Sequence, residues 1–79
     1  MSEVARNEFH RFTYAQQRRV MDPLYGRIAR AVDRLRVARE AGDVKGARRA
    51  KRDFRLFGSA VLALGWDLSP EAVAFVGRA

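Results

Sequence analysis

The chain has 79 residues, which is enough for one small hydrophobic core but not for two, so a single helical domain over residues 1–79 is expected. Its net charge of +7 favours anionic partners such as nucleic acid, an acidic protein surface or anionic lipid. The lack of cysteine excludes disulfides and thiolate chemistry, and the longest apolar run, Leu56–Trp66, is too short to span a bilayer. We therefore expect a cytoplasmic protein without a transmembrane segment, in which dimerisation could add stability.

The N-terminal segment predicts a helix within residues 1–21. Ser2 is a suitable N-cap. Residues at helical spacing fall on two faces: one carries Ala5, Phe9, Phe12, Gln16 and Val20, and the other carries His10, Arg11, Tyr14 and Arg18. The second face interleaves aromatic and basic side chains, so it could stack on exposed bases or contact phosphates. A half-exposed surface helix without a partner explains the same pattern, and whether this segment is ordered alone stays open.

A second helix is expected over residues 23–41. Asp22 is a capping carboxylate, and Pro23 would occupy the first helical position, where a missing N–H costs nothing. The helix would bury an apolar seam formed by Leu24, Ile28, Ala31, Val32, Leu35 and Ala38.

The three residues Ala41-Gly42-Asp43 predict a tight link to a third helix over residues 43–65. Gly42 can adopt the left-handed conformation that ends a helix, and Asp43 can cap the next one. Two long helices with so short a link form an antiparallel hairpin. The seam of the third helix would contain Val44, Ala47, Ala50, Phe54, Phe57, Val61 and Leu64.

A short fourth helix is expected after the third. Ser69 is its predicted N-cap and Pro70 its first residue. The predicted fold is therefore all-α: an antiparallel helical hairpin flanked by an N-terminal helix and a short C-terminal helix.

Basic residues of the third helix fall on the side opposite its seam. Lys45, Arg48, Arg52 and Arg55 lie on one ridge, with Arg49 and Lys51 beside it. The predicted contact residues, hereafter the basic stripe of this helix, are Lys45, Arg48, Arg49, Arg52 and Arg55. A second, weaker stripe on the second helix consists of Arg27, Arg30 and Arg34. Cations at spacings of three and four repel one another, and an anionic partner would offset that cost. The stripes predict a module that contacts nucleic-acid phosphates with little sequence specificity. A solvated outer face with Asp53 as its local partner is the alternative.

The end of the third helix has an apolar or small face outside the seam, formed by Leu56, Ser59, Leu62 and Ala63. The first and fourth helices could cover this face. If they do not, it suits a homodimer or a protein partner. The alternative function is therefore a protein–protein adaptor or inhibitor, such as a small regulatory or phage-type protein. It would bind its partner through the apolar end of the third helix, the fourth helix or the first helix, and its predicted interface residues are Leu56, Leu62, Trp66 and Phe75.

Catalysis is not expected. The single histidine, His10, and the scattered carboxylates do not form a metal-ligand pattern, and no glycine-rich phosphate loop or nucleophile motif occurs. We predict no metal and no cofactor.

Overall fold

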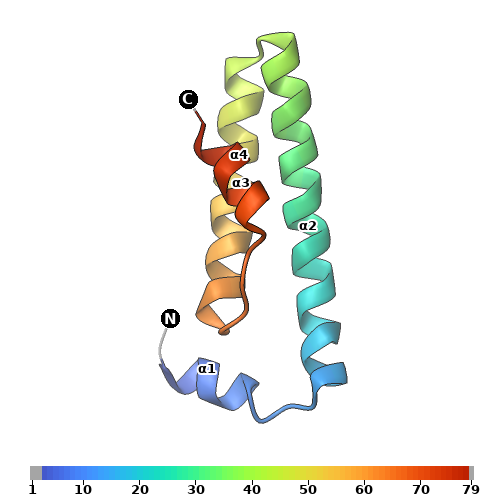
Figure 1. Ribbon diagram of the computed structural model, residues 1–79, viewed down its shortest axis with the longest axis vertical. Helices are drawn as coiled ribbons and strands as arrows, with labels where there is room; N and C mark the ends of the chain where they lie inside the picture. Colours follow the sequence, from blue (N-terminus) through green and yellow to red (C-terminus); the bar gives the residue numbers. More distant parts are fainter. Residues whose placement is uncertain (1–2, 79) are drawn as a thin grey trace.

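The computed structural model describes residues 3–78, and every element of that range is a helix (Figure 1). The two long helices α2 and α3 pack side by side as a hairpin, and the short helices α1 and α4 lie at its lower end and against its side. The molecule is elongated, with extents of 44 × 22 × 19 Å. The predicted all-α hairpin is confirmed. The helices are α1 (Glu3–Phe9), α2 (Tyr14–Ala41), α3 (Val44–Ala63) and α4 (Pro70–Gly77).

Helix α2 begins nine residues earlier than the sequence predicts. Its N-cap is Thr13, whose side chain accepts a hydrogen bond from the Gln16 N–H, while the Gln16 side chain accepts one from the Thr13 N–H. This reciprocal capping box satisfies two donors that a helix start leaves without partners. The prediction of a helix start at Asp22-Pro23 is wrong, because Pro23 lies inside α2. The uninterrupted helix places Met21 in the core with no exposed surface.

Helix α1 is correspondingly short. It ends at Phe9, and a turn leads to Thr13, so the single N-terminal helix predicted within residues 1–21 is wrong. The break removes the expected shared face: Phe9 is buried, but Phe12 is 49% exposed and Val20 is 43% exposed. Ser2, the predicted cap, lies outside the described residues.

The hairpin link follows the prediction. Gly42 has a φ of 68°, a left-handed conformation that glycine adopts without strain. The Asp43 side chain accepts a hydrogen bond of 2.9 Å from the Gly46 N–H and so caps α3. Gly42 ends α2 and Asp43 begins α3, so adjacent residues of the link determine the hairpin turn.

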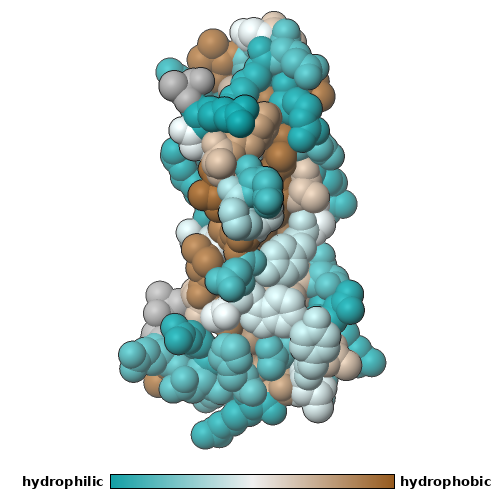
Figure 2. All heavy atoms as spheres, in the orientation of Figure 1, coloured by the Kyte–Doolittle hydropathy of each residue, from teal (hydrophilic) through white to brown (hydrophobic). Residues whose placement is uncertain are grey.

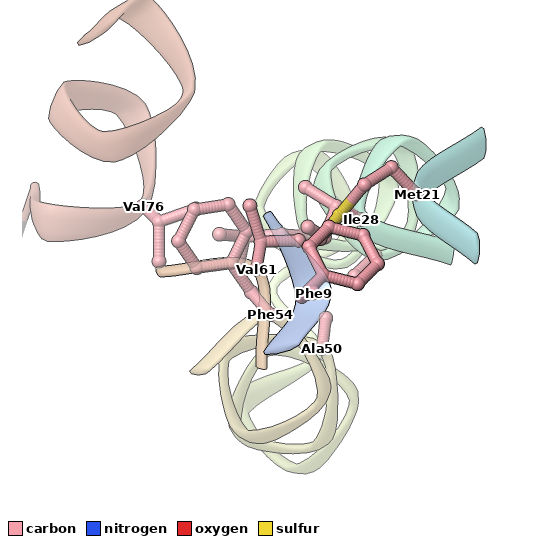
Figure 3. Packing of buried hydrophobic residues seen from close by; sticks show 9 residues of the cluster. Phe9, Met21, Ile28, Ala50, Phe54, Val61 and Val76 are labelled. Atoms are coloured by element: carbon pink, nitrogen blue, oxygen red, sulfur yellow. The ribbon is translucent and has the colours of Figure 1, made fainter. Parts of the chain in front are cut away.

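The core lies between the helices and receives side chains from all four (Figure 3). Most of the predicted seams are buried or half-buried, whereas Val44 is 64% exposed because it lies in the first turn of α3, beside the link. Met21 is a core residue that the predicted seams lack. The buried hydrophobic residues are Phe9, Met21, Ile28, Ala31, Leu35, Ala38, Ala50, Phe54, Val61 and Val76.

Helix α4 packs against α2 and continues the core through Val76. Its predicted start is confirmed: the Ser69 hydroxyl accepts a hydrogen bond from the Ala72 N–H, and Pro70 is the first helical residue. On the face seen in Figure 2, hydrophobic residues gather around α4 and hydrophilic residues cover the lower end. No helix within residues 3–78 combines the length and hydrophobicity that crossing a membrane requires.

Candidate nucleic-acid interface

The basic stripe of α3 points away from the core. Because Ala50, Phe54 and Val61 occupy the buried side of this helix, periodicity places the cations on the outer side. The residues of this stripe, all exposed, are Lys45, Arg48, Arg49, Arg52 and Arg55. Three ion pairs occur within residues 3–78, and none of them involves a residue of this stripe. The positive charge on this side of α3 is therefore not neutralised by neighbouring acids.

The second stripe belongs to α2 and faces a shallow groove beside α3. The groove has a volume of about 220 Å³ and is lined by Arg27, Arg30, Arg34, Asp53 and Phe57. A guanidinium nitrogen of Arg34 lies 2.6 Å from a carboxylate oxygen of Asp53, and the guanidinium of Arg27 lies 5.3 Å from the centre of the Phe57 ring. These arginines are exposed but partly engaged within the chain.

The two stripes meet along one flank of α3. Asp53 follows Arg49 by four residues, so both lie on the same side of the helix. In the alternative of a solvated outer face, Asp53 is the local partner of the α3 stripe, but in the structure it pairs with Arg34 of α2. The α2 stripe therefore borders the α3 stripe, and one acidic group lies between them.

Arg39 has a role that the sequence did not indicate. Its guanidinium donates hydrogen bonds to three carbonyl oxygens at the end of α4, those of Phe75 at 2.6 Å, Val76 at 3.3 Å and Arg78 at 2.8 Å. The last carbonyls of a helix lack partners within it, and a cation there also suits the helix dipole. These acceptors lie 36 to 39 residues away in the chain, so no local pattern could have identified the contact.

A second polar region lies at the lower end of the hairpin, where α1, α2 and the loop after α3 meet. It is a hollow of about 410 Å³, hereafter the aromatic hollow, lined by His10, Tyr14, Tyr25, Gly65, Trp66 and Asp67. The expected helical face of His10, Arg11, Tyr14 and Arg18 is wrong, because the turn between α1 and α2 separates its first two members from the others. The fold nevertheless brings His10 and Tyr14 to the same hollow.

Hydrogen bonds fix two of the rings of the aromatic hollow. The Trp66 indole N–H donates to the Gln17 side-chain oxygen at 2.9 Å, and the Tyr25 hydroxyl donates to the Asp67 carbonyl oxygen. Burial raises the pKa of Tyr25 above its usual value, and the negative charge of Asp67 raises it further. Tyr25 therefore stays protonated and keeps its hydrogen bond at neutral pH.

The four predicted protein-interface residues fall into two groups. Leu56 and Leu62 are 63% and 52% exposed. Trp66 and Phe75 are half-buried by contacts within the chain, and Phe75 lies under the guanidinium of Arg39 at 4.8 Å. Of the apolar face at the end of α3, Leu56, Leu62 and Ser59 are exposed, so the short helices do not cover it.

Within residues 3–78 no cluster of three or more histidine, cysteine, aspartate or glutamate side chains has an arrangement that could hold a metal ion. A scan against protein-family models and searches of curated proteins and of solved structures found no match to this chain.

Proposed function

We propose that the protein is a non-catalytic binding module that contacts nucleic-acid phosphates through the basic stripe of α3. The observation that carries the proposal is the exposure of Lys45, Arg48, Arg49, Arg52 and Arg55 without an ion pair among the described residues. Arginines on one helix face can follow a phosphate backbone, and phosphate contacts carry no sequence information. Low sequence specificity is therefore part of the proposal.

The α2 stripe extends this surface in the proposal. Arg27 and Arg30 lie on the α2 side of the shallow groove, and Arg34 is already partnered by Asp53. We assign the stronger contribution to α3, since Arg34 would have to exchange an existing carboxylate for a phosphate.

Reversing the charge of three α3 arginines tests the proposal. The triple variant Arg48→Glu, Arg52→Glu, Arg55→Glu should lose binding to a fluorescent duplex and to a single strand, measured by anisotropy at low salt. Since all three side chains are exposed, circular dichroism and thermal unfolding should remain close to those of the parent.

A charge-matched control separates a defined surface from a general effect of net charge. The variant Arg19→Glu, Arg36→Glu, Arg78→Glu changes the net charge by the same amount on exposed residues outside both stripes. It should retain most of the affinity. If the two triple variants lose affinity equally, or if the α3 variant binds like the parent, no binding surface exists on α3.

A protein–protein adaptor is the second candidate function, and the uncovered apolar face at the end of α3 favours it. Such a contact would bury Leu56 and Leu62 and would depend little on salt. In the homodimer form of this candidate, sedimentation should give a dimer that the variant Leu56→Asp, Leu62→Asp converts to a monomer. A monomeric parent at all concentrations would rule out the homodimer form.

A further inference from the structure

The aromatic hollow combines the rings of Tyr14, Tyr25 and Trp66 with an opening to solvent. Tyr14 and Trp66 are stacked, with ring centres 5.8 Å apart and planes inclined by 15°, and Tyr25 lies 6.1 Å from Trp66 at 47°. Tyr14 is nevertheless 67% exposed. An exposed aromatic ring at the mouth of a hollow is suited to stacking on a planar ligand.

We propose that the aromatic hollow binds an unpaired nucleobase of a single-stranded nucleic acid. This inference rests on the proposed function and specifies its substrate: single strands in preference to duplexes. Unpaired bases stack on tyrosine and tryptophan rings, and every base offers a face for stacking, so the contact tolerates sequence. The bases of a duplex are stacked on each other and are not free to enter.

Two rings of the hollow, those of Trp66 and Tyr25, are held in place by hydrogen bonds before any ligand arrives. Gln17 holds the Trp66 indole, and the Asp67 carbonyl oxygen holds the Tyr25 hydroxyl. Gly65 has a φ of +86°, and a Cβ at this position would overlap the His10 ring. The close approach of His10 to the chain at Gly65 thus requires glycine, and both residues line the hollow. Fixed rings lose little conformational freedom when a base stacks on them.

Charges around the hollow favour a base inside it and phosphates at its edge. The Arg18 guanidinium lies 6.0 Å from the centre of the Tyr14 ring, and the Arg6 side chain lies beside Gly65. Arg6 is an exposed cation that suits the phosphates flanking a base. Arg18 is also exposed, but it pairs with Asp22 at 3.5 Å and would exchange that carboxylate for a phosphate. Asp67 lines the hollow itself, and its negative charge disfavours phosphate there. The base therefore enters the hollow, and the backbone stays outside.

Trp66 provides a direct measurement, because it is the only tryptophan of the chain. The experiment compares three probes of equal length: a single strand of mixed sequence, an abasic strand with the same phosphates, and a duplex. Affinity is measured by anisotropy and stacking by the fluorescence of Trp66. Only the mixed-sequence strand should quench Trp66, and it should bind more tightly than the abasic strand.

Variants at Tyr14 connect this signal to the hollow. Tyr14→Ala should weaken binding of the mixed-sequence strand by at least about fivefold, the lower end for loss of one base–aromatic stack, and leave binding of the abasic strand unchanged. Tyr14→Phe retains the ring and should behave like the parent. Phe12→Ala is the matched control, since Phe12 is an exposed aromatic residue that does not line the hollow.

The result that would overturn the inference differs from the one that would overturn the proposed function. Equal affinity for the mixed-sequence and abasic strands, with Trp66 emission unchanged, would show that no base enters the hollow, while phosphate binding by α3 would stand. If neither strand nor the duplex binds, both the inference and the proposed function are wrong.

Discussion

Arg39 and Arg52 have the same side chain, but the fold gives them different surroundings. Arg39 is half-buried and donates to three carbonyl oxygens at the end of α4, with its guanidinium also 4.8 Å from the Phe75 ring centre. Arg52 is exposed on α3, and none of the three ion pairs within residues 3–78 includes it. The charge of Arg39 therefore stabilises the fold, whereas the charge of Arg52 is available to a partner.

Removing Arg39 should destabilise the protein without changing its affinity for nucleic acid. Arg39→Ala leaves several helix-end carbonyls without their donor, and we expect a loss of about 1–3 kcal/mol in the free energy of unfolding, measured by urea denaturation. Arg39→Lys should lose part of this, because lysine lacks the planar fork that reaches several oxygens at once.

Arg36→Ala is the control for Arg39. Arg36 also lies over Phe75 and pairs with Asp33, but both partners of that pair are exposed. Such pairs contribute at most about 1 kcal/mol. If Arg36→Ala proves as destabilising as Arg39→Ala, the hydrogen bonds to α4 are not the source of the effect.

At the scale of elements, the start of α2 determines its length and which of its residues are buried. The capping box of Thr13 and Gln16 starts the helix, and the helix then continues through Pro23. Proline in a helix interior lacks the N–H for one hydrogen bond and crowds the preceding turn. Burial of Met21 favours the continuous helix in spite of this cost.

The position of Pro23 gives a stability prediction whose sign depends on the helix boundary. Pro23→Ala should stabilise the protein by about 2 kcal/mol, because alanine restores the missing hydrogen bond and removes the crowding, less a small gain in the freedom of the unfolded chain. Chemical denaturation of the variant and the parent measures the difference. A neutral or destabilising substitution would contradict the continuous helix and would instead fit a helix that starts at Pro23.

The elements that the sequence predicts well are those whose signals are local. Gly42 and Asp43 set the hairpin within three residues, and Ser69 and Pro70 set the start of α4. The predicted helix start at Pro23 is wrong because an Asp-Pro pair can occur both at a helix start and inside a helix. The Thr13-x-x-Gln16 spacing is a capping-box signal that could have located the start of α2.

The features of the candidate site also differ in whether local sequence patterns predict them. Helical periodicity alone places the α3 stripe outside the core. The Arg34–Asp53 pair joins residues 19 positions apart, and the Trp66–Gln17 hydrogen bond at the aromatic hollow joins residues 49 positions apart. Both contacts follow only from the packing of the helices.

At the scale of the whole molecule, the exposed basic and apolar residues of α3 follow one another along an elongated body. The basic residues of α3 occupy its first part, from Lys45 to Arg55, and the exposed apolar residues Leu56 and Leu62 follow. The aromatic hollow lies beyond them at the lower end of the hairpin. The basic stripe and the aromatic hollow therefore lie at different positions along the long axis of the molecule.

The dependence of affinity on salt tests the central claim most directly. For a duplex, the logarithm of the binding constant should fall linearly with the logarithm of salt concentration, by about 0.9 for each phosphate contacted. Replacing Arg48, Arg52 and Arg55 with glutamine should reduce this slope by about 2.7, because three contacts are lost. An unchanged slope in that variant, or a parent affinity that does not vary with salt, would contradict the assignment of α3 as a phosphate-binding surface.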